Sequence, residues 1–301
     1  ISVPDLKGQV VTAINSGIDM LMEPQFYPDC YKYIIEAVKE GIISQERIDD
    51  AVTRIIRVKQ ELGLFDDPMQ ERLQMSYSDV GSAEVRDIAR QLVEKSLVLL
   101  KNDGDVLPIK PGSKIFVTGP AMHDTGVQCG GWTIEWQGYI DSNNTKFVAG
   151  ATTILEGLYA IADQYGLTII TDEEQASQAD LTILCVGEIP YAEWEGDTPD
   201  LSLTGSHALP GNKKAIELAK SLNKPTVTLI VAGRNMIIED YYDSWDAVVM
   251  CYLPGSEADG IANVLTGKVP FSGTLPMPWY KSVNDIGTGN YKFDIGYGLK
   301  Y

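Results

Sequence analysis

The hydrophobic positions in the second half of the chain form short apolar runs that alternate with helical patterns. From Lys114 onward the runs are KIFVTG, LTII, LTILCVG, TVTLIVAG and AVVMCYLPG. Between them lie helical segments such as TTILEGLYAIADQYG, GNKKAIELAKSL and SEADGIANVLTG. Near-continuous apolar strands joined by helices are typical of a mostly parallel sheet that is covered on both faces. The pattern therefore predicts an α/β fold, with one three-layer α/β sandwich over residues 112–301.

The first 65 residues show a different order of elements, namely helix, strand, helix, helix. QVVTAINSG predicts a helix that ends at Gly17, and IDMLME predicts a short buried strand stopped by Pro24. DCYKYIIEAVKEG predicts a second helix, and Ser44 is expected to cap a third one that ends at Gly63. These elements are too few for a domain, but they fit the end of a TIM-like α/β barrel.

Residues 66–111 are predicted to connect these two parts. The segment DDPMQERLQMSYSDVGS is polar and is predicted to be irregular, and a helix is expected from Ser82 to about Lys95. SLVLLKN then has the pattern of a strand. The predicted organisation is the last strand and helices of an N-terminal barrel at 1–65, a connector at 66–111 and the sandwich at 112–301.

Composition and charge exclude several classes of function. Apolar residues make up 44% of the 301 residues, and no apolar run approaches the roughly 18 residues of a membrane span, which predicts a soluble chain. The formal charge of −18 argues against nucleic acid and anionic membranes as partners, because phosphate contacts need clustered Lys and Arg. A neutral or cationic substrate fits this charge.

The residues that usually hold metals or cofactors are scarce. The four cysteines form no CxxC pair, and the chain has only two histidines, so no metal site and no disulfide framework are indicated. Cys185 and Cys251 lie inside apolar strand patterns and are expected to be core residues. The segment TGPAMHDTGVQCGG matches no phosphate-binding loop, so no nucleotide cofactor is expected.

Acidic and aromatic side chains follow the predicted strands directly. Ligands of such a sheet bind beyond the carboxyl ends of its strands. Flat aromatic rings can cover sugar faces, and carboxylates can bind hydroxyl groups or move protons. This edge therefore suits a carbohydrate. The residues are Trp132, Glu135 and Trp136 after the first strand, Glu188, Tyr191, Glu193 and Trp194 after the third, Arg234 after the fourth and Glu257 after the fifth.

Each of these residues also has a structural interpretation. Glu188 can be a polar residue at the end of a strand, and Trp136 and Trp194 are as apt to pack as to bind a ligand. Arg234 is expected to pair with a local carboxylate. Glu257 stands where a helix begins, so it is expected to complement the helix dipole.

Several segments together resemble glycoside hydrolase family 3, the β-glucosidase and exo-β-glucanase family. They are AINSGIDMLMEP, RIDDAVTRIIRVKQELGLFDDP, KSLVLLKNDGDVLPI, QCGGWTIEWQG, VGEIPYAEWEGD, LPGSEADG and DIGYGLKY. The resemblance covers nearly the whole chain, and QCGGWTIEWQG is similar to the branch of cereal β-D-glucan glucohydrolases and their bacterial relatives. It implies a barrel followed by an α/β sandwich, with the active site between the two domains.

The resemblance also implies roles for individual residues. Such enzymes are retaining and use two carboxylates, an aspartate nucleophile from the barrel and a glutamate acid/base from the sandwich. Glu188 in VGEIPY matches the acid/base, with Glu193 on the same loop as the second choice. Trp132 in GGWT matches one wall of the aromatic clamp at the mouth of the pocket. The SDW-like motif of the nucleophile is not found in this sequence, and Asp5 in VPDLKG is not assigned to it.

The sequence therefore predicts the C-terminal portion of a retaining, exo-acting β-glucosidase or exo-β-glucanase that releases terminal β-linked glucose without a cofactor. Alone, the chain should be nearly inactive, because an N-terminal barrel in the same or a separate chain must supply the nucleophile. The alternatives are a non-catalytic carbohydrate-binding fragment and a β-N-acetylglucosaminidase of the same family. A secreted or periplasmic location is slightly favoured over a cytoplasmic one.

Overall fold

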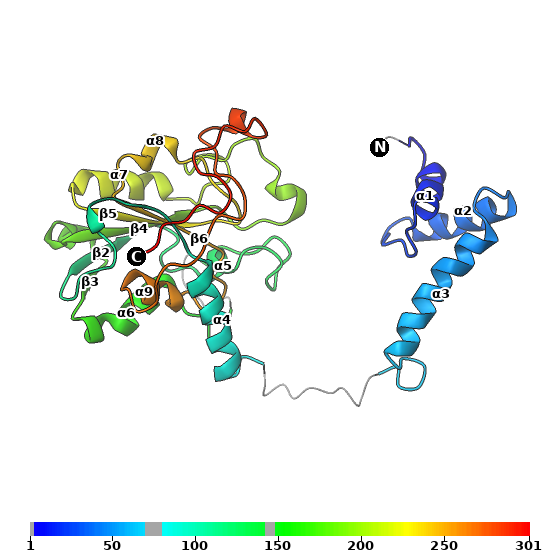
Figure 1. Cartoon of the computed structure of the whole chain (residues 1–301), viewed down its shortest axis with the longest axis horizontal. Helices are drawn as coiled ribbons and strands as arrows, with labels where there is room; N and C mark the ends of the chain where they lie inside the picture. Colours follow the sequence, from blue (N-terminus) through cyan, green and yellow to red (C-terminus); the bar gives the residue numbers. More distant parts are fainter. Residues whose placement is uncertain (1–2, 70–79, 142–147) are drawn as a thin grey trace. The chain divides into compact units, whose positions relative to one another are not determined.

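The computed structural model describes residues 3–69, 80–141 and 148–301 (Figure 1). The chain divides into two compact units, Ile1–Asp79 and Val80–Tyr301. Each unit is described by itself.

The described residues of the smaller unit form three helices. They are α1 (Leu6–Asn15), α2 (Tyr27–Lys39) and α3 (Gln45–Glu61). The hydroxyl of Ser44 accepts a hydrogen bond from the backbone N–H of Arg47, so it caps α3 as the sequence predicts. The buried core of this unit is small and is formed by Ile14, Ala37 and Ile43.

The strand predicted at IDMLME is wrong, because these residues adopt no regular structure. They are not buried either: Met20 is 73% exposed and Met22 is 97% exposed. A strand needs a neighbouring strand to take up its backbone hydrogen bonds, and the described residues of this unit contain none. The apolar pattern therefore indicates a hydrophobic segment correctly, but it does not indicate burial.

The larger unit is built on a six-stranded sheet with the strand order β1-β6-β5-β4-β2-β3. All neighbours pair in parallel except β1, which is antiparallel to β6. This arrangement confirms the predicted α/β fold with a mostly parallel sheet. The strands are β1 (Val98–Asn102), β2 (Lys114–Thr118), β3 (Thr168–Ile170), β4 (Leu181–Gly187), β5 (Thr226–Val231) and β6 (Ala247–Tyr252).

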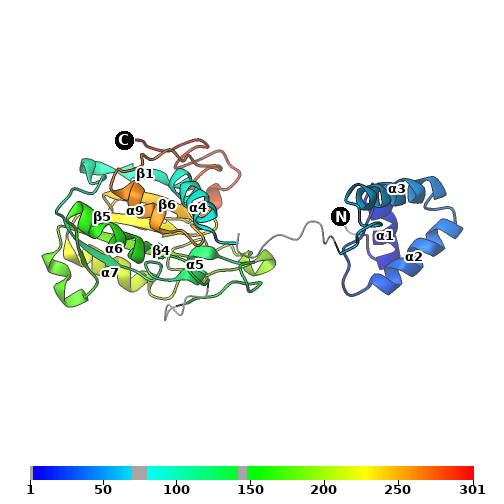
Figure 2. The ribbon, with the colours of Figure 1, turned by 90° about the horizontal axis from the view of Figure 1, so that it is seen from below.

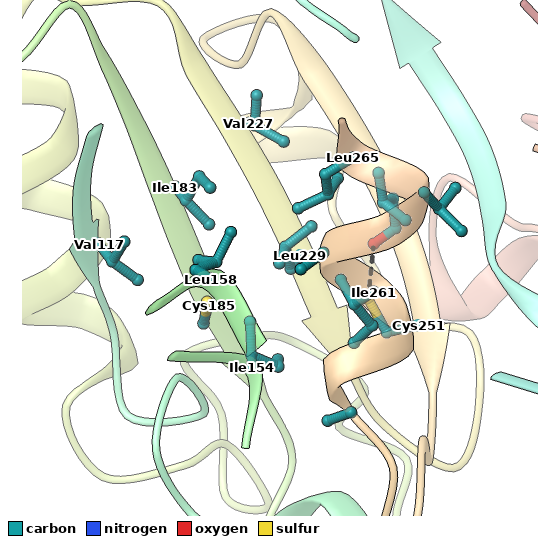
Figure 3. Packing of buried hydrophobic residues seen from close by; sticks show 14 of the residues in the cluster. Val117, Ile154, Leu158, Ile183, Cys185, Val227, Leu229, Cys251, Ile261 and Leu265 are labelled. Atoms are coloured by element: carbon teal, nitrogen blue, oxygen red, sulfur yellow. Dashed lines mark hydrogen bonds between the residues drawn. The ribbon is translucent and has the colours of Figure 1, made fainter. Parts of the chain in front are cut away.

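Helices cover both faces of this sheet, so the unit has three layers (Figures 1 and 2). Alternate residues of one strand face opposite layers: Cys185 packs in the cluster with α6 and α9, whereas Leu184 packs in the cluster with α7. Figure 3 shows the first cluster, including the fully buried Cys185 and Cys251, which confirms their prediction as core residues. The helices of the unit are α4 (Ala83–Ser96), α5 (Thr125–Cys129), α6 (Ile154–Tyr165), α7 (Asn212–Leu222), α8 (Glu239–Tyr242) and α9 (Asp259–Leu265).

The helix and strand of the predicted connector are part of the larger unit. Ser82 caps α4 through a hydrogen bond from Val85, as the sequence predicts. Helix α4 contacts α9, and β1 forms the antiparallel edge of the sheet. Helix α4 also carries two arginines, Arg86 and Arg90, that bind the loop after β6.

Candidate active site

Glu188 stands at the carboxyl edge of the sheet, directly after the buried strand β4. Its backbone N–H donates to the carbonyl oxygen of Val231, 3.1 Å away, which continues the pairing of β4 with β5. A Cβ atom at Gly187 would lie 1.8 Å from that same oxygen, so only glycine allows this close approach. The side chain of Asn212 adds support, since its amide donates to the carbonyl oxygens of Gly187 and Leu203 at 2.7 and 2.8 Å.

The carboxylate of Glu188 is almost fully buried, and its residue is only 3% exposed. It forms an ion pair with Arg234, whose Nη2 and Nε lie 2.7 and 2.9 Å from Oε1. The hydroxyl of Tyr191 donates to Oε2 over 3.2 Å. A buried carboxylate needs such partners, so the contacts account for its burial. The expectation that Arg234 pairs with a local carboxylate is confirmed.

Arg234 also fixes the loop that follows Glu188. Its Nη1 donates to the carbonyl oxygen of Gly196 over 2.6 Å, and its guanidinium lies 4.6 Å from the centre of the Tyr191 ring. Burial, and next the negative charge of Glu188, raise the pKa of the Tyr191 hydroxyl to about 12. Tyr191 therefore stays protonated at neutral pH and acts as a hydrogen-bond donor.

A cavity of about 40 Å³ adjoins Glu188, between Tyr191, Gly131, Gly233 and Leu253. Ligand pockets usually measure roughly 300 Å³ or more. This cavity is too small for a sugar ring. Beside Glu188, the described residues of the larger unit therefore provide a carboxylate and part of a wall but no complete sugar pocket.

Trp132 directly follows Gly130 and Gly131, which line this cavity, and it is 69% exposed. The segment packs tightly against the Glu188 loop, because a Cβ atom at Gly131 would lie 2.2 Å from the carbonyl oxygen of Tyr191. The side-chain oxygen of Gln137 accepts a hydrogen bond from the N–H of Ala192 over 2.8 Å. The structure thus brings the segments of Trp132 and Glu188 together.

Glu193, the second choice for the acid/base, begins the 3-10 turn Glu193–Gly196 and is exposed. Its backbone has a φ of 53°, in the left-handed region that most residues avoid. Glu195 and Asp197 on the same loop are exposed as well. Among the acids of this loop, only Glu188 is buried.

Glu257 forms ion pairs that the sequence does not predict. Its carboxylate is ion-paired with Arg86 at 2.8 Å and with Arg90 at 3.3 Å, both from α4. Helix α9 begins two residues later, at Asp259, which itself pairs with Arg90. The direct ion pairs from α4 account for the burial of Glu257.

Sequence reasoning missed two residues that position the site. Asn212 is the first residue of α7, whose sequence shows only an amphipathic helix. An Asn at the start of a helix, directly before its apolar face, could have indicated a tertiary contact. Gln137 accepts the hydrogen bond of Ala192 from a loop 55 residues away in the chain, and no sequence pattern predicts this contact. Among the described residues, no cluster of His, Cys, Asp or Glu could hold a metal ion. Likewise, no helix in these ranges has the length and apolar character needed to cross a membrane.

Comparison with known proteins gives a consistent set of relatives. Residues 97–301 match the glycosyl hydrolase family 3 C-terminal domain, and residues 3–58 match the family 3 N-terminal domain. The chain is 32% identical to a lysosomal beta glucosidase of Dictyostelium discoideum, over 97% of this chain and 38% of that protein. It is 26% identical to a periplasmic beta-glucosidase of Salmonella typhimurium, over 94% of this chain and 40% of that protein.

A solved structure is also similar. It is a mutant of the exo-1,3/1,4-beta-glucanase of a Pseudoalteromonas species, with 36% identity and a TM-score of 0.79. The match covers 97% of this chain and 49% of that one. The chain therefore spans between a third and a half of the length of these relatives. With a match over two thirds of its residues, the chain belongs to glycoside hydrolase family 3, as its sequence motifs indicate.

Proposed function

We propose that this chain is part of a retaining, exo-acting β-glucosidase or exo-β-glucanase, in which Glu188 is the general acid/base. The observation that carries the proposal is the placement of Glu188, buried at the carboxyl edge of the sheet and held by Arg234 and Tyr191. The segment of Trp132 lies beside it. The relatives named as β-glucosidases and as an exo-1,3/1,4-beta-glucanase support terminal β-linked glucose as the substrate.

The proposed reaction has two steps. In the first, an aspartate attacks the anomeric carbon while Glu188 gives its proton to the glycosidic oxygen, and the bond between these two substrate atoms breaks. In the second, the ionised Glu188 takes a proton from water, and the water oxygen displaces the aspartate from the sugar. The proposal assigns the aspartate to a barrel in the same or a separate chain.

The ion pair sets a condition on this mechanism. The oxygens of Glu188 already accept hydrogen bonds from Arg234 and Tyr191, which suits the ionised carboxylate that acts as base. To donate a proton to a sugar oxygen, Glu188 must lose at least one of these bonds. The Tyr191 bond, 3.2 Å long, is the one we expect to open. Glu193 is the second candidate because its side chain is already exposed.

The test is a comparison of Glu188→Ala and Glu193→Ala in the protein assembled with its barrel, with native mass spectrometry to verify the assembly. Loss of the acid/base should slow cleavage of a glucose disaccharide by roughly 10²–10⁴-fold. A dinitrophenyl glucoside, whose leaving group needs little protonation, should still form the glycosyl-enzyme. Added azide should then restore turnover and yield the β-glucosyl azide, because azide needs no general base.

The two variants distinguish the candidates. Azide rescue in Glu188→Ala but not in Glu193→Ala supports the proposal, and the reverse result transfers the role to Glu193. An α-configured azide product would exclude retention. If both variants keep wild-type turnover on the disaccharide, neither glutamate is the acid/base.

We also propose that residues 1–65 are the end of a barrel, including its last helices, and that α4 and β1 of the predicted connector 66–111 belong with the sandwich. The match of residues 3–58 to the family's N-terminal domain supports this division, as do the exposed apolar residues Ile18, Met20 and Met22, which would pack against further barrel elements. Intact mass, denatured and native, tests the barrel. A denatured mass above 33.0 kDa or a bound second chain supports it. A lone 33.0 kDa species in both spectra favours a non-catalytic binding fragment.

A location outside the cytoplasm, secreted or periplasmic, completes the proposal. Its support is that the two curated relatives are named as lysosomal and periplasmic proteins. Fractionation of the source cells followed by detection of the chain in the medium, periplasm or cytoplasm would decide it, and a purely cytoplasmic pool would contradict it.

A further inference from the structure

We infer that Trp132, Trp136 and Trp194 form one binding shelf for the distal units of a neutral gluco-oligosaccharide, so that the chain favours longer glucans. This inference rests on the proposed function and goes beyond it, because the family resemblance assigns only one of the three rings, Trp132, to the clamp, as one of its walls. The new residues are Trp136 and Trp194, and the new property is the dependence of affinity on chain length.

The first argument is the arrangement of the rings. The centres of Trp132 and Trp136 are 6.2 Å apart, and those of Trp136 and Trp194 are 5.2 Å apart with the rings at 71°. The three rings therefore form a continuous array. They are nevertheless exposed by 69%, 42% and 60% respectively, although a large indole ring gains most from burial.

The second argument is the backbone that presents these rings. Trp132 and Ile134 have φ values of 60° and 63°, and Glu193, directly before Trp194, has a φ of 53°. Left-handed conformations cost free energy in residues with a side chain, and they concentrate at functional sites. Here the left-handed residues occur on both loops of the array, and the tryptophans of both loops are nevertheless exposed.

The third argument is the rigid link to Glu188. The two loops are joined by the hydrogen bond from Ala192 to Gln137 and by the close approach of Gly131 to Tyr191. Trp194 lies six residues after Glu188 on the same loop, whose far end is fixed by the bond from Arg234 to Gly196. A glycan whose cleaved bond reaches Glu188 would therefore extend toward rings at a fixed place.

The negative charge of the two loops favours a neutral ligand over an anionic one. Segments 129–141 and 187–200 contain no Lys or Arg, and Glu135, Glu193 and Glu195 are exposed among the rings. Anionic ligands would be repelled. A neutral sugar suits both features, because its C–H faces stack on indole rings and its hydroxyl groups donate to carboxylates.

The experiment measures binding of linear β-1,3- and β-1,4-linked glucose oligomers of two to six units to the 301-residue chain by calorimetry. Variants Trp194→Ala, Trp136→Ala and Trp194→Phe are compared with Tyr159→Ala, which removes from α6 an aromatic ring that is 50% exposed. Wild-type affinity should rise with oligomer length. Each Trp→Ala change should weaken binding of the hexamer by roughly tenfold and of the dimer by less than about twofold. Trp194→Phe should retain most of the increase in affinity with oligomer length, and Tyr159→Ala should leave the affinity for every oligomer unchanged.

Several results would overturn the shelf. One is a length dependence that survives in both Trp→Ala variants, and another is the absence of binding at every length. A third is a change in native mass on Trp194→Ala with unchanged sugar affinity, which would make the ring a protein contact. None of these results affects the azide test of Glu188, and a failure of that test would leave the binding measurements valid. Circular dichroism of each variant excludes misfolding as the cause.

Discussion

Glu188 and Glu257 follow β4 and β6, the two strands that flank β5 in the sheet, and they are similar in several respects. Their exposures are 3% and 2%, and each carboxylate is paired with arginine. Burial and an arginine partner therefore do not by themselves mark a catalytic acid.

The two glutamates differ in what surrounds the ion pair. Arg234 comes from the loop after β5, so the pair of Glu188 lies at the open edge of the sheet, beside a small cavity and the exposed tryptophans. Arg86 and Arg90 come from helix α4, so the pair of Glu257 joins two packed elements of the fold. We propose that the first pair positions a reactive group and that the second stabilises the domain.

The largest expected effect separates these two roles. Glu188→Gln, in the protein assembled with its barrel, should reduce turnover of a glucose disaccharide by roughly 10²–10⁴-fold, because glutamine cannot transfer the proton. Glu257→Gln, the matched change in the other ion pair, should reduce turnover by less than about threefold once corrected for the folded fraction. Steady-state kinetics with urea denaturation of both variants checks this. Equal losses of turnover in the two variants would remove the distinction.

The next effect concerns stability. The double change Arg86→Ala and Arg90→Ala leaves Glu257 buried without a cationic partner, and we expect a loss of about 3–5 kcal/mol in the free energy of unfolding. Arg234→Ala should cost less, because Tyr191 still donates to Glu188 and the small cavity can admit water. Urea denaturation followed by circular dichroism compares them. A larger loss in Arg234→Ala would mean that the Glu188 pair is the main structural one.

A smaller effect depends on pH and on Tyr191. Its pKa is raised from 10.0 to about 12, so the folded protein holds this proton more tightly than the unfolded chain does. The resulting stabilisation is fully present below pH 10 and is lost as the pH rises from 10 toward 12. Tyr191→Phe should therefore show a flatter fall in stability over this range. At neutral pH it should lose roughly 1–2 kcal/mol, because the carboxylate of Glu188 loses a donor. Parallel pH slopes in the two proteins would contradict the assignment.

The sequence is sufficient to predict the sheet but not these pairings. Strands such as β4 and β5 are buried on both faces, so their apolar runs identify them without further information. The caps at Ser44 and Ser82 are local as well, since each hydroxyl binds a backbone group three residues later. Such features depend only on neighbours in the chain.

The interactions that the sequence does not reveal join distant residues. Glu257 is 171 residues from Arg86 in the chain, so the sequence does not reveal their ion pair. Its position before a helix indicates only a contact with the helix dipole. Residues 18–23 show another feature that the sequence does not reveal. Their apolar run indicates a hydrophobic segment, but it does not indicate whether another segment covers it. The exposure of Trp194 is of the same kind: its loop can be placed after β4, but only the fold shows that the ring faces outward.

The smallest expected effect tests whether the Glu188 loop is held at its far end. Both carboxylate oxygens of Asp200 accept backbone hydrogen bonds, from Ser202 at 3.1 Å and from Ser206 at 2.9 Å. These bonds, chiefly the one from Ser206, lower the pKa of Asp200 below its ordinary value of 3.8. The stabilisation is therefore present above pH 3.8 and is lost as the pH falls through the lower pKa of Asp200 in the folded protein.

Asp200→Asn should reduce the free energy of unfolding by about 0.5–1 kcal/mol at pH 7, and this difference from wild type should shrink as the pH becomes strongly acidic. Thermal melts at pH 7 and pH 3 measure it, with Asp240→Asn on α8 as the control. A difference that persists unchanged at low pH would show that the charge of Asp200 does not hold the turn. The support of the Glu188 loop would then rest on its other contacts, such as those of Arg234, Asn212 and Gln137.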